Sequence, residues 1–135
     1  MDVARATPGD VAACLALNPG LQRERARHVA AAFAAGRGWI VRDAGEIAGF
    51  AHTGMFFGHA LIELVFVAPG FRRRGAASAL MRAIAAACEG DRIFTSTNES
   101  NASMRALCAK LGWAASGVID NLDPGDPELI FVKCL

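Results

Sequence analysis

Residues 67–80 read Val67-Ala68-Pro69-Gly70-Phe71-Arg72-Arg73-Arg74-Gly75-Ala76-Ala77-Ser78-Ala79-Leu80, and this stretch decides the fold of the chain. An apolar run from Leu61 to Val67 leads into it and predicts a strand, and an alanine-rich helical pattern from Ala76 to Cys88 leads out of it. The first N–H groups of a helix have no partner within the helix, and the helix dipole adds partial positive charge there. Strand, basic glycine turn and helix therefore predict a site for a phosphate or diphosphate.

The bulk properties limit the classes of function. A chain of 135 residues fits one domain, which we place at residues 1–135. Fourteen basic and 13 acidic residues leave a net charge of +1, so no general basic field indicates a nucleic-acid partner. The longest apolar stretch is interrupted by Glu63 and is too short to cross a bilayer. The N-terminus has no apolar signal region, so we expect a cytoplasmic protein without a membrane partner.

The cysteines and histidines show no spacing that is typical of metal ligands. There is no Cys-x-x-Cys motif and no adjoining histidine pair, so we expect no metal site and interpret the cysteines as reduced, buried thiols. The four cysteines are Cys14, Cys88, Cys108 and Cys134.

Periodicity and turn residues predict a definite order of elements. We expect strands at about 2–6, 39–42, 46–52, 61–67, 91–97, 113–119 and 128–134, and helices at about 7–17, 21–35, 75–89 and 101–111. The aromatic stretch at 55–59 is a loop or a strand end, which either lines a site or packs in the core. The order β-α-α-β-β-β-α-β-α-β-β implies a mixed sheet with helices on both faces.

Two motifs carry a resemblance to a known family. The pattern Arg-x-x-Gly-x-Ala at Arg72, Gly75 and Ala77 resembles the acyl-CoA-binding motif of the GCN5-related N-acetyltransferase (GNAT) family. The stretch from Asn101 to Trp113 resembles that family's later motif, in which Asn opens a helix that ends in Lys-Leu-Gly-aromatic. The two occur in the right order, and a looser resemblance covers nearly the whole chain. It implies the α/β (α+β mixed) acyl-CoA N-acyltransferase fold, with a central, mixed, mostly antiparallel sheet.

The resemblance implies acetyl-CoA as co-substrate and identifies the residues that would bind it. The glycine turn and helix start would hold the diphosphate, largely through main-chain N–H groups, although a solvated charged turn is the alternative for the arginines. Main-chain groups of Phe66 and Val67 would face the pantetheine arm, and Asn101 would bind the arm, cap its helix, or do both. The cradle residues are Arg72, Arg73, Arg74, Gly75, Ala76, Ala77 and Ser78.

Glu63 is the candidate general base, because it interrupts an otherwise apolar strand and a carboxylate beside buried surface becomes a better base. An outward-facing charge in an alternating strand is the alternative. The resemblance places an oxyanion-binding N–H near Phe66 or Val67. Relatives use a Tyr as general acid where this chain has Cys108, and the chain contains no tyrosine. Cys108, a water or Ser103 could replace it, or the thiolate leaves without an acid.

We therefore expect an acyl-CoA-dependent N-acyltransferase that transfers acetyl by direct attack of a primary amine of a small molecule or protein. A non-catalytic acyl-CoA sensor is the alternative, which the missing tyrosine favours. A nucleotide-phosphate protein is disfavoured, because there is no Walker lysine and no dinucleotide glycine triplet. The carboxylates at 120–128 form either a rim that attracts a cationic amine or ordinary turn chemistry. The family resemblance also implies that the chain can form a homodimer.

Overall fold

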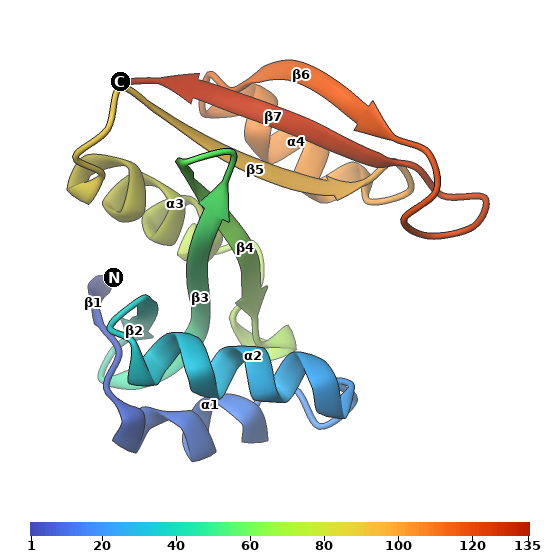
Figure 1. Cartoon of the computed structure of the whole chain (residues 1–135). Coiled ribbons are helices and arrows are strands. Elements are labelled where there is room, and N and C mark those ends of the chain that lie inside the picture. Colours follow the sequence, from blue (N-terminus) through green and yellow to red (C-terminus); the bar gives the residue numbers. More distant parts are fainter. The chain divides into compact units, whose positions relative to one another are not determined.

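The computed structural model describes all 135 residues and contains seven strands that hydrogen-bond in the order β1-β2-β3-β4-β5-β7-β6 (Figure 1). The strands are β1 (Asp2–Arg5), β2 (Gly38–Asp43), β3 (Glu46–Phe56), β4 (His59–Val67), β5 (Arg92–Asn98), β6 (Ala114–Ile119) and β7 (Glu128–Cys134). The helices are α1 (Val11–Ala16), α2 (Arg23–Ala34), α3 (Ala76–Ala87) and α4 (Ala102–Lys110), with short 3₁₀ turns at Pro8–Asp10 and Pro69–Phe71.

The sheet is mixed and mostly antiparallel, as predicted. The pairs β1–β2, β2–β3, β5–β7 and β6–β7 are antiparallel, whereas β4 and β5 pair in parallel. The order of strands and helices matches the predicted order, and the boundaries differ by only a few residues except at β3.

Contacts along the chain define two compact units. The first unit comprises Met1–Gly54 and Glu63–Ala87, and the second comprises Met55–Ile62 and Cys88–Leu135. The strands β3 and β4 contribute residues to both units. Whether the whole chain behaves as one domain stays a prediction.

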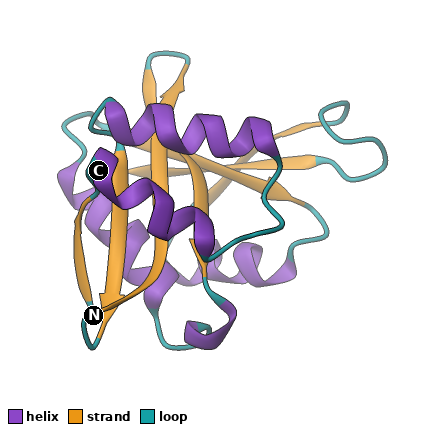
Figure 2. Cartoon of the chain, turned by 90° about the horizontal axis from the view of Figure 1, so that it is seen from below, coloured by secondary structure: helices purple, strands orange, loops and turns teal.

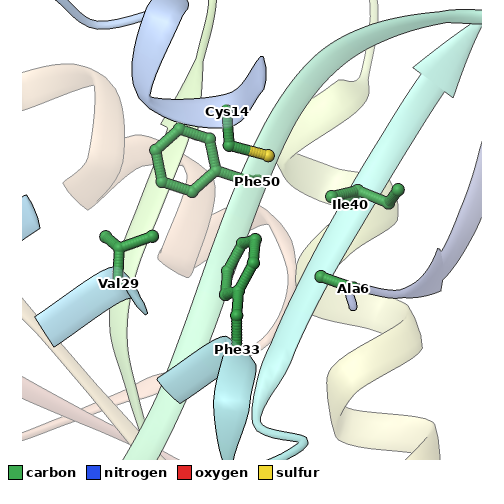
Figure 3. Packing of buried hydrophobic residues seen from close by; sticks show 6 residues of the cluster. All are labelled: Ala6, Cys14, Val29, Phe33, Ile40 and Phe50. Carbon is green, nitrogen blue, oxygen red and sulfur yellow. The ribbon is translucent and has the colours of Figure 1, made fainter. Parts of the chain in front are cut away.

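The core of the first unit lies where α1 and α2 meet β2 and β3 (Figure 3). Phe33 of α2 meets Phe50 of β3 edge to face, with 6.3 Å between the ring centroids. The predicted apolar face of α2 is confirmed, since Val29, Ala32 and Phe33 are all buried. The cluster consists of Ala6, Cys14, Val29, Phe33, Ile40 and Phe50.

Helices cover both faces of β1 and β2 in the first unit. Ile40 packs into the cluster under α1 and α2, while its neighbours Trp39 and Val41 are also buried. Successive side chains of a strand point to opposite faces, so the second face must be covered as well. Helix α3 contacts both β1 and β2 and supplies that cover, with Leu80, Met81 and Ile84 buried. The predicted arrangement of helices on both faces is confirmed for this part of the sheet.

The second unit is built on β5, with the antiparallel pair β7 and β6 beside it. Thr95 of β5 donates a buried hydrogen bond from Oγ1 to the Ile62 carbonyl of β4 at 3.1 Å. Helix α4 lies behind β5 and β7 in the view of Figure 1. Lys133 of β7 donates to the Leu111 carbonyl at the end of α4 at 2.7 Å, which ties the helix to the sheet.

The β3–β4 connection is a tight hairpin, in which residues 55–59 form two strand ends and the turn between them (Figure 2). Strand β3 continues to Phe56, and Phe57 and Gly58 turn the chain with φ angles of 50° and 79°. Two-residue hairpins favour positive φ at both turn positions, and a Phe rarely adopts it. The expected strand end is confirmed, and the side chain of Phe57, which is 88% exposed, does not pack in the core.

None of the helices has the length and apolar character that crossing a membrane requires.

Candidate functional site

The basic glycine turn joins β4 to α3 in an unusual backbone conformation. Arg73 has φ 63° and Gly75 has φ 88°, so two residues of the turn are left-handed. A non-glycine residue in this region costs about 1–2 kcal/mol, and such strain concentrates at functional sites. A Cβ added to Gly75 would meet no atom within 4 Å, so the turn is open at this point. Turns of this kind direct successive N–H groups toward an anion.

Helix α3 starts directly after this turn. The Ala79 N–H donates to the Gly75 carbonyl at 2.9 Å, which is the first hydrogen bond of the helix. The N–H groups of Ala76, Ala77 and Ser78 therefore lie in the first turn, where no intrahelical acceptor exists. Ala76 is buried and anchors the helix start, while Ala77 and Ser78 are half-buried. The arrangement can hold a diphosphate through main-chain donors.

The three arginines of the turn are exposed, and two have partners. Arg72 donates from Nε to the Val67 carbonyl at 3.2 Å, and Arg74 pairs with Asp43 at 3.3 Å. These contacts hold the guanidinium groups beside the turn. Exposed pairs of this kind contribute little to stability, so the arginines remain able to meet a charged ligand.

The end of β4 presents different residues to its two edges. A Cβ on Gly49 of β3 would overlap the Phe66 carbonyl oxygen, and the Ala68 N–H donates to the Ala48 carbonyl at 2.8 Å. The main-chain groups of Phe66 and Ala68 therefore face β3. Because main-chain groups alternate between edges, those of Val65 and Val67 face the opposite edge. The Phe66 ring lies 5.5 Å from the Phe50 ring and packs on the core.

Glu63 lies on β4 with its side chain 35% exposed, so it is not buried in an apolar surface as the sequence suggested. Its Oε2 lies 3.4 Å from Nδ1 of His52 on β3. His52 itself is only 4% exposed. Burial, followed by the charges of Arg37, His28 and Arg25, lowers the pKa of His52 to about 4. The imidazole is therefore neutral at neutral pH.

The later motif lies in the second unit. Asn101 caps α4, since its Oδ1 accepts from the Met104 N–H at 3.1 Å. Cys108 is fully buried, and burial raises the pKa of its thiol to about 11. Ser103 is exposed on the same helix. The cap is therefore confirmed, while Cys108 has no surface through which to reach a ligand in this conformation.

The acidic loop between β6 and β7 uses two of its carboxylates internally. Asp126 accepts from the Ser100 N–H at 3.0 Å and from its hydroxyl at 2.6 Å. Asp123 accepts from Nδ2 of Asn98 at 2.8 Å. These bonds fasten the loop to the end of β5, which supports the turn-forming interpretation for these two residues. No group of three or more His, Cys, Asp or Glu side chains is arranged to hold a metal ion.

The sequence did not single out Gly54 or Val65 as candidate site residues, and it gave His52 only as a histidine that lines a cleft or packs in the core. Glycine inside a strand can mark a close approach by another group, but the predicted strand ended at residue 52, before Gly54. His52 carried no signal of its contact with Glu63, because this partner comes from another strand.

Comparison with known proteins gives a consistent result. The model of the acetyltransferase (GNAT) family matches residues 10–113. A solved GNAT-family acetyltransferase from Bacillus cereus ATCC 10987 is 33% identical, with a TM-score of 0.92, over 98% of this chain and 96% of that one. No curated protein sequence gives a significant match.

Two more distant structures are similar in fold. The ribosomal-protein-S18-alanine N-acetyltransferase of Escherichia coli is 18% identical, with a TM-score of 0.84, over 97% of this chain and 91% of that one. An aminoglycoside 6'-N-acetyltransferase solved with coenzyme A is 15% identical, with a TM-score of 0.78, over 99% of this chain and 97% of that one. At these identities the likeness establishes the fold alone.

Proposed function

This chain belongs to the GNAT family of acetyltransferases, and we propose from that premise that it transfers an acetyl group from acetyl-CoA to a primary amine of a small molecule or a protein. The family uses acetyl-CoA as its acetyl donor. One structure of the same fold, an aminoglycoside acetyltransferase, was solved with coenzyme A, which supports the choice of donor.

The single observation that carries the proposal is the turn at Arg73 and Gly75. Two left-handed residues lead directly into the start of α3, and the position of a Gly75 Cβ is open. The diphosphate of acetyl-CoA would accept hydrogen bonds from the first N–H groups of α3, and the exposed arginines would add charge. The residues of this cradle are Arg72, Arg73, Arg74, Gly75, Ala76, Ala77 and Ser78.

The pantetheine arm carries amides and can pair with a strand edge. The alternation along β4 supports the main-chain groups of Val65 and Val67 as its partners, since those of Phe66 face β3. The Val67 carbonyl already accepts from Arg72, so its N–H is the group left for the ligand or for the oxyanion. The contact of Asn101 with the arm stays a proposal beside its capping role.

Glu63 is the proposed general base. Its carboxylate is partly exposed, and in this proposal it would take the proton of a bound ammonium directly or through one water. The neutral amine then attacks the thioester carbon, the C–S bond breaks, and the amide forms as CoA thiolate leaves. A thiolate is a tolerable leaving group near neutral pH, so water can supply its proton. The burial of Cys108 disfavours it as the acid.

Donor binding is the first test of the proposal. Calorimetry with acetyl-CoA and with CoA should show binding to the wild-type protein. Arg72→Glu and Gly75→Glu should each abolish it, the first by charge and the second by charge and backbone strain at φ 88°. Arg82→Glu, a matched charge reversal on the exposed face of α3, should bind normally. A wild-type protein that gives no binding heat with either ligand would refute the proposal.

Turnover separates an enzyme from a sensor. Thiol release is followed with a panel of small amines and N-terminal peptides. The absence of tyrosine and the burial of Cys108 favour a non-catalytic acyl-CoA sensor as the second candidate. Binding with turnover supports the enzyme, and binding without turnover of any amine supports the sensor. Glu63→Gln should slow turnover by about 100-fold while acetyl-CoA affinity stays within twofold.

A further inference from the structure

The carboxylate of Glu63 lies in a site formed by two residues of the neighbouring strand. Its Oε2 lies 3.4 Å from His52 Nδ1. Its Oε1 lies against the bare Cα of Gly54, so closely that a Cβ at this position would overlap it. The side chains of residues i and i+2 of a strand lie on one face, so His52 and Gly54 act on the carboxylate from the same side. Each oxygen of Glu63 therefore has its own neighbour on β3.

Burial and the main-chain bonds of β3 hold the His52 side chain in a fixed position, from which it can orient Glu63. Its side chain is 5% exposed, and its Nδ1 is buried without a hydrogen-bond partner of normal geometry. The adjacent main chain is fixed to β2, because His52 pairs with Gly38 in the strand register and the Thr53 N–H donates to the Arg37 carbonyl at 3.0 Å. The Arg37 guanidinium also donates to the Thr53 carbonyl.

The charge state of the imidazole determines how many hydrogen bonds its ring nitrogens can donate. The groups that face it are Arg37 immediately before β2, Arg25 and His28 on α2, and Glu63 on β4. Burial, followed by the charges of Arg37, His28 and Arg25, keeps His52 uncharged, with a pKa of about 4. A neutral imidazole carries one N–H and one lone pair. Only the tautomer with the proton on Nδ1 gives the Glu63 carboxylate a hydrogen-bond donor, and it also gives the buried Nδ1 a hydrogen-bond partner.

We propose that His52 and Gly54 are positioning residues for Glu63: His52 donates from Nδ1 to Oε2, and the missing side chain at Gly54 leaves the space that Oε1 occupies. The inference rests on the proposed role of Glu63 as the base. Hydrogen bonds in active sites are often long in the free enzyme and shorten when the substrate is bound, which accounts for the 3.4 Å separation. The two contacts limit the rotamers of a flexible side chain and point its free lone pairs in one direction.

Gly54→Ala tests whether Glu63 needs the space beside the Cα of Gly54. The new methyl overlaps Oε1, and the carboxylate must move until its oxygen lies about 3.5 Å away. The obstacle is the mobile end of a side chain, so the protein should fold normally. A displacement of about 1 Å in a catalytic group can reduce the rate by about 100-fold. We expect kcat to fall by about 30- to 100-fold with unchanged affinity for acetyl-CoA. Gly20→Ala is the matched control, since its Cβ meets nothing within 4 Å.

Two substitutions at His52 test its role as hydrogen-bond donor to Glu63. In His52→Asn the amide nitrogen stands near the position of Nδ1 and can still donate, so most of the activity should remain. His52→Leu removes the donor and should reduce kcat about as much as Gly54→Ala. A double-mutant cycle with Glu63→Gln gives the decisive readout. Because both residues act through Glu63, neither Gly54→Ala nor His52→Leu should slow the Glu63→Gln protein further.

The tautomer is measured without activity. Nitrogen NMR of the imidazoles should show His52 protonated on Nδ1 at pH 7, and Glu63→Leu should shift the proton toward Nε2. A wild-type His52 protonated mainly on Nε2 overturns the proposal, as do additive losses in the cycle. If Glu63→Gln leaves turnover unchanged, the base role itself is wrong. If Glu63→Gln slows turnover but Gly54→Ala does not, only the positioning role is wrong.

Discussion

Acidification should destabilise this protein through His52. In the unfolded chain its imidazole titrates near the ordinary pKa of 6.5, whereas in the folded protein burial lowers the pKa to about 4. The unfolded state therefore binds the proton more tightly, and the stability that the neutral imidazole provides is complete above pH 6.5 and is lost as the pH falls toward 4. One pKa unit corresponds to about 1.4 kcal/mol, so the full loss is about 3 kcal/mol. At pH 4.5 most of it has occurred.

Urea unfolding followed by circular dichroism at pH 7.5, 5.5 and 4.5 measures this effect. Other groups titrate in the same range, so the quantity of interest is the difference between wild type and His52→Gln. The free energy of unfolding of the wild type should fall by about 2–3 kcal/mol more than that of the variant between pH 7.5 and 4.5. Parallel pH dependences of wild type and His52→Gln would refute the reasoning.

Three further predictions concern the core, the thiols and the acidic loop. Phe50→Ala should lower the free energy of unfolding by about 3–5 kcal/mol in urea titrations, because the fully buried ring leaves a cavity between α2 and β3. Alkylation at pH 8, mapped by mass spectrometry, should modify the exposed Cys134 and spare Cys14 and Cys108, whose pKa values burial raises to about 12 and about 11; rapid modification of either would contradict their burial. Asp126→Ala should increase hydrogen exchange of the Ser100 amide by about tenfold, because this amide loses its acceptor. Unchanged exchange would show that the bond does not form.

The order of elements was predictable from the sequence because local signals defined it. The apolar face of α2 and the strand before the glycine turn followed their expected periods, and Asn101 capped α4 as its position suggested. The two resembling motifs then indicated the family and the fold, and both are confirmed.

The local environment of the site was not predictable. Alternation on β4 could not show that Glu63 lies beside His52, because the pairing joins two strands and depends on the whole fold. The hairpin at Phe57 was missed, since its turn uses a residue that seldom takes a positive φ. The sequence left Cys108 open both as a buried thiol and as the general acid, and the packing of α4, which buries it, favours the first.

The space above Gly54 links two positions that lie nine residues apart in the chain. The two positions are not free to vary independently, because any larger residue at position 54 would displace the carboxylate at position 63. Homologous sequences should therefore inherit glycine and glutamate together or exchange both. This joint inheritance would mark the family members that share the proposed base and the space that positions it.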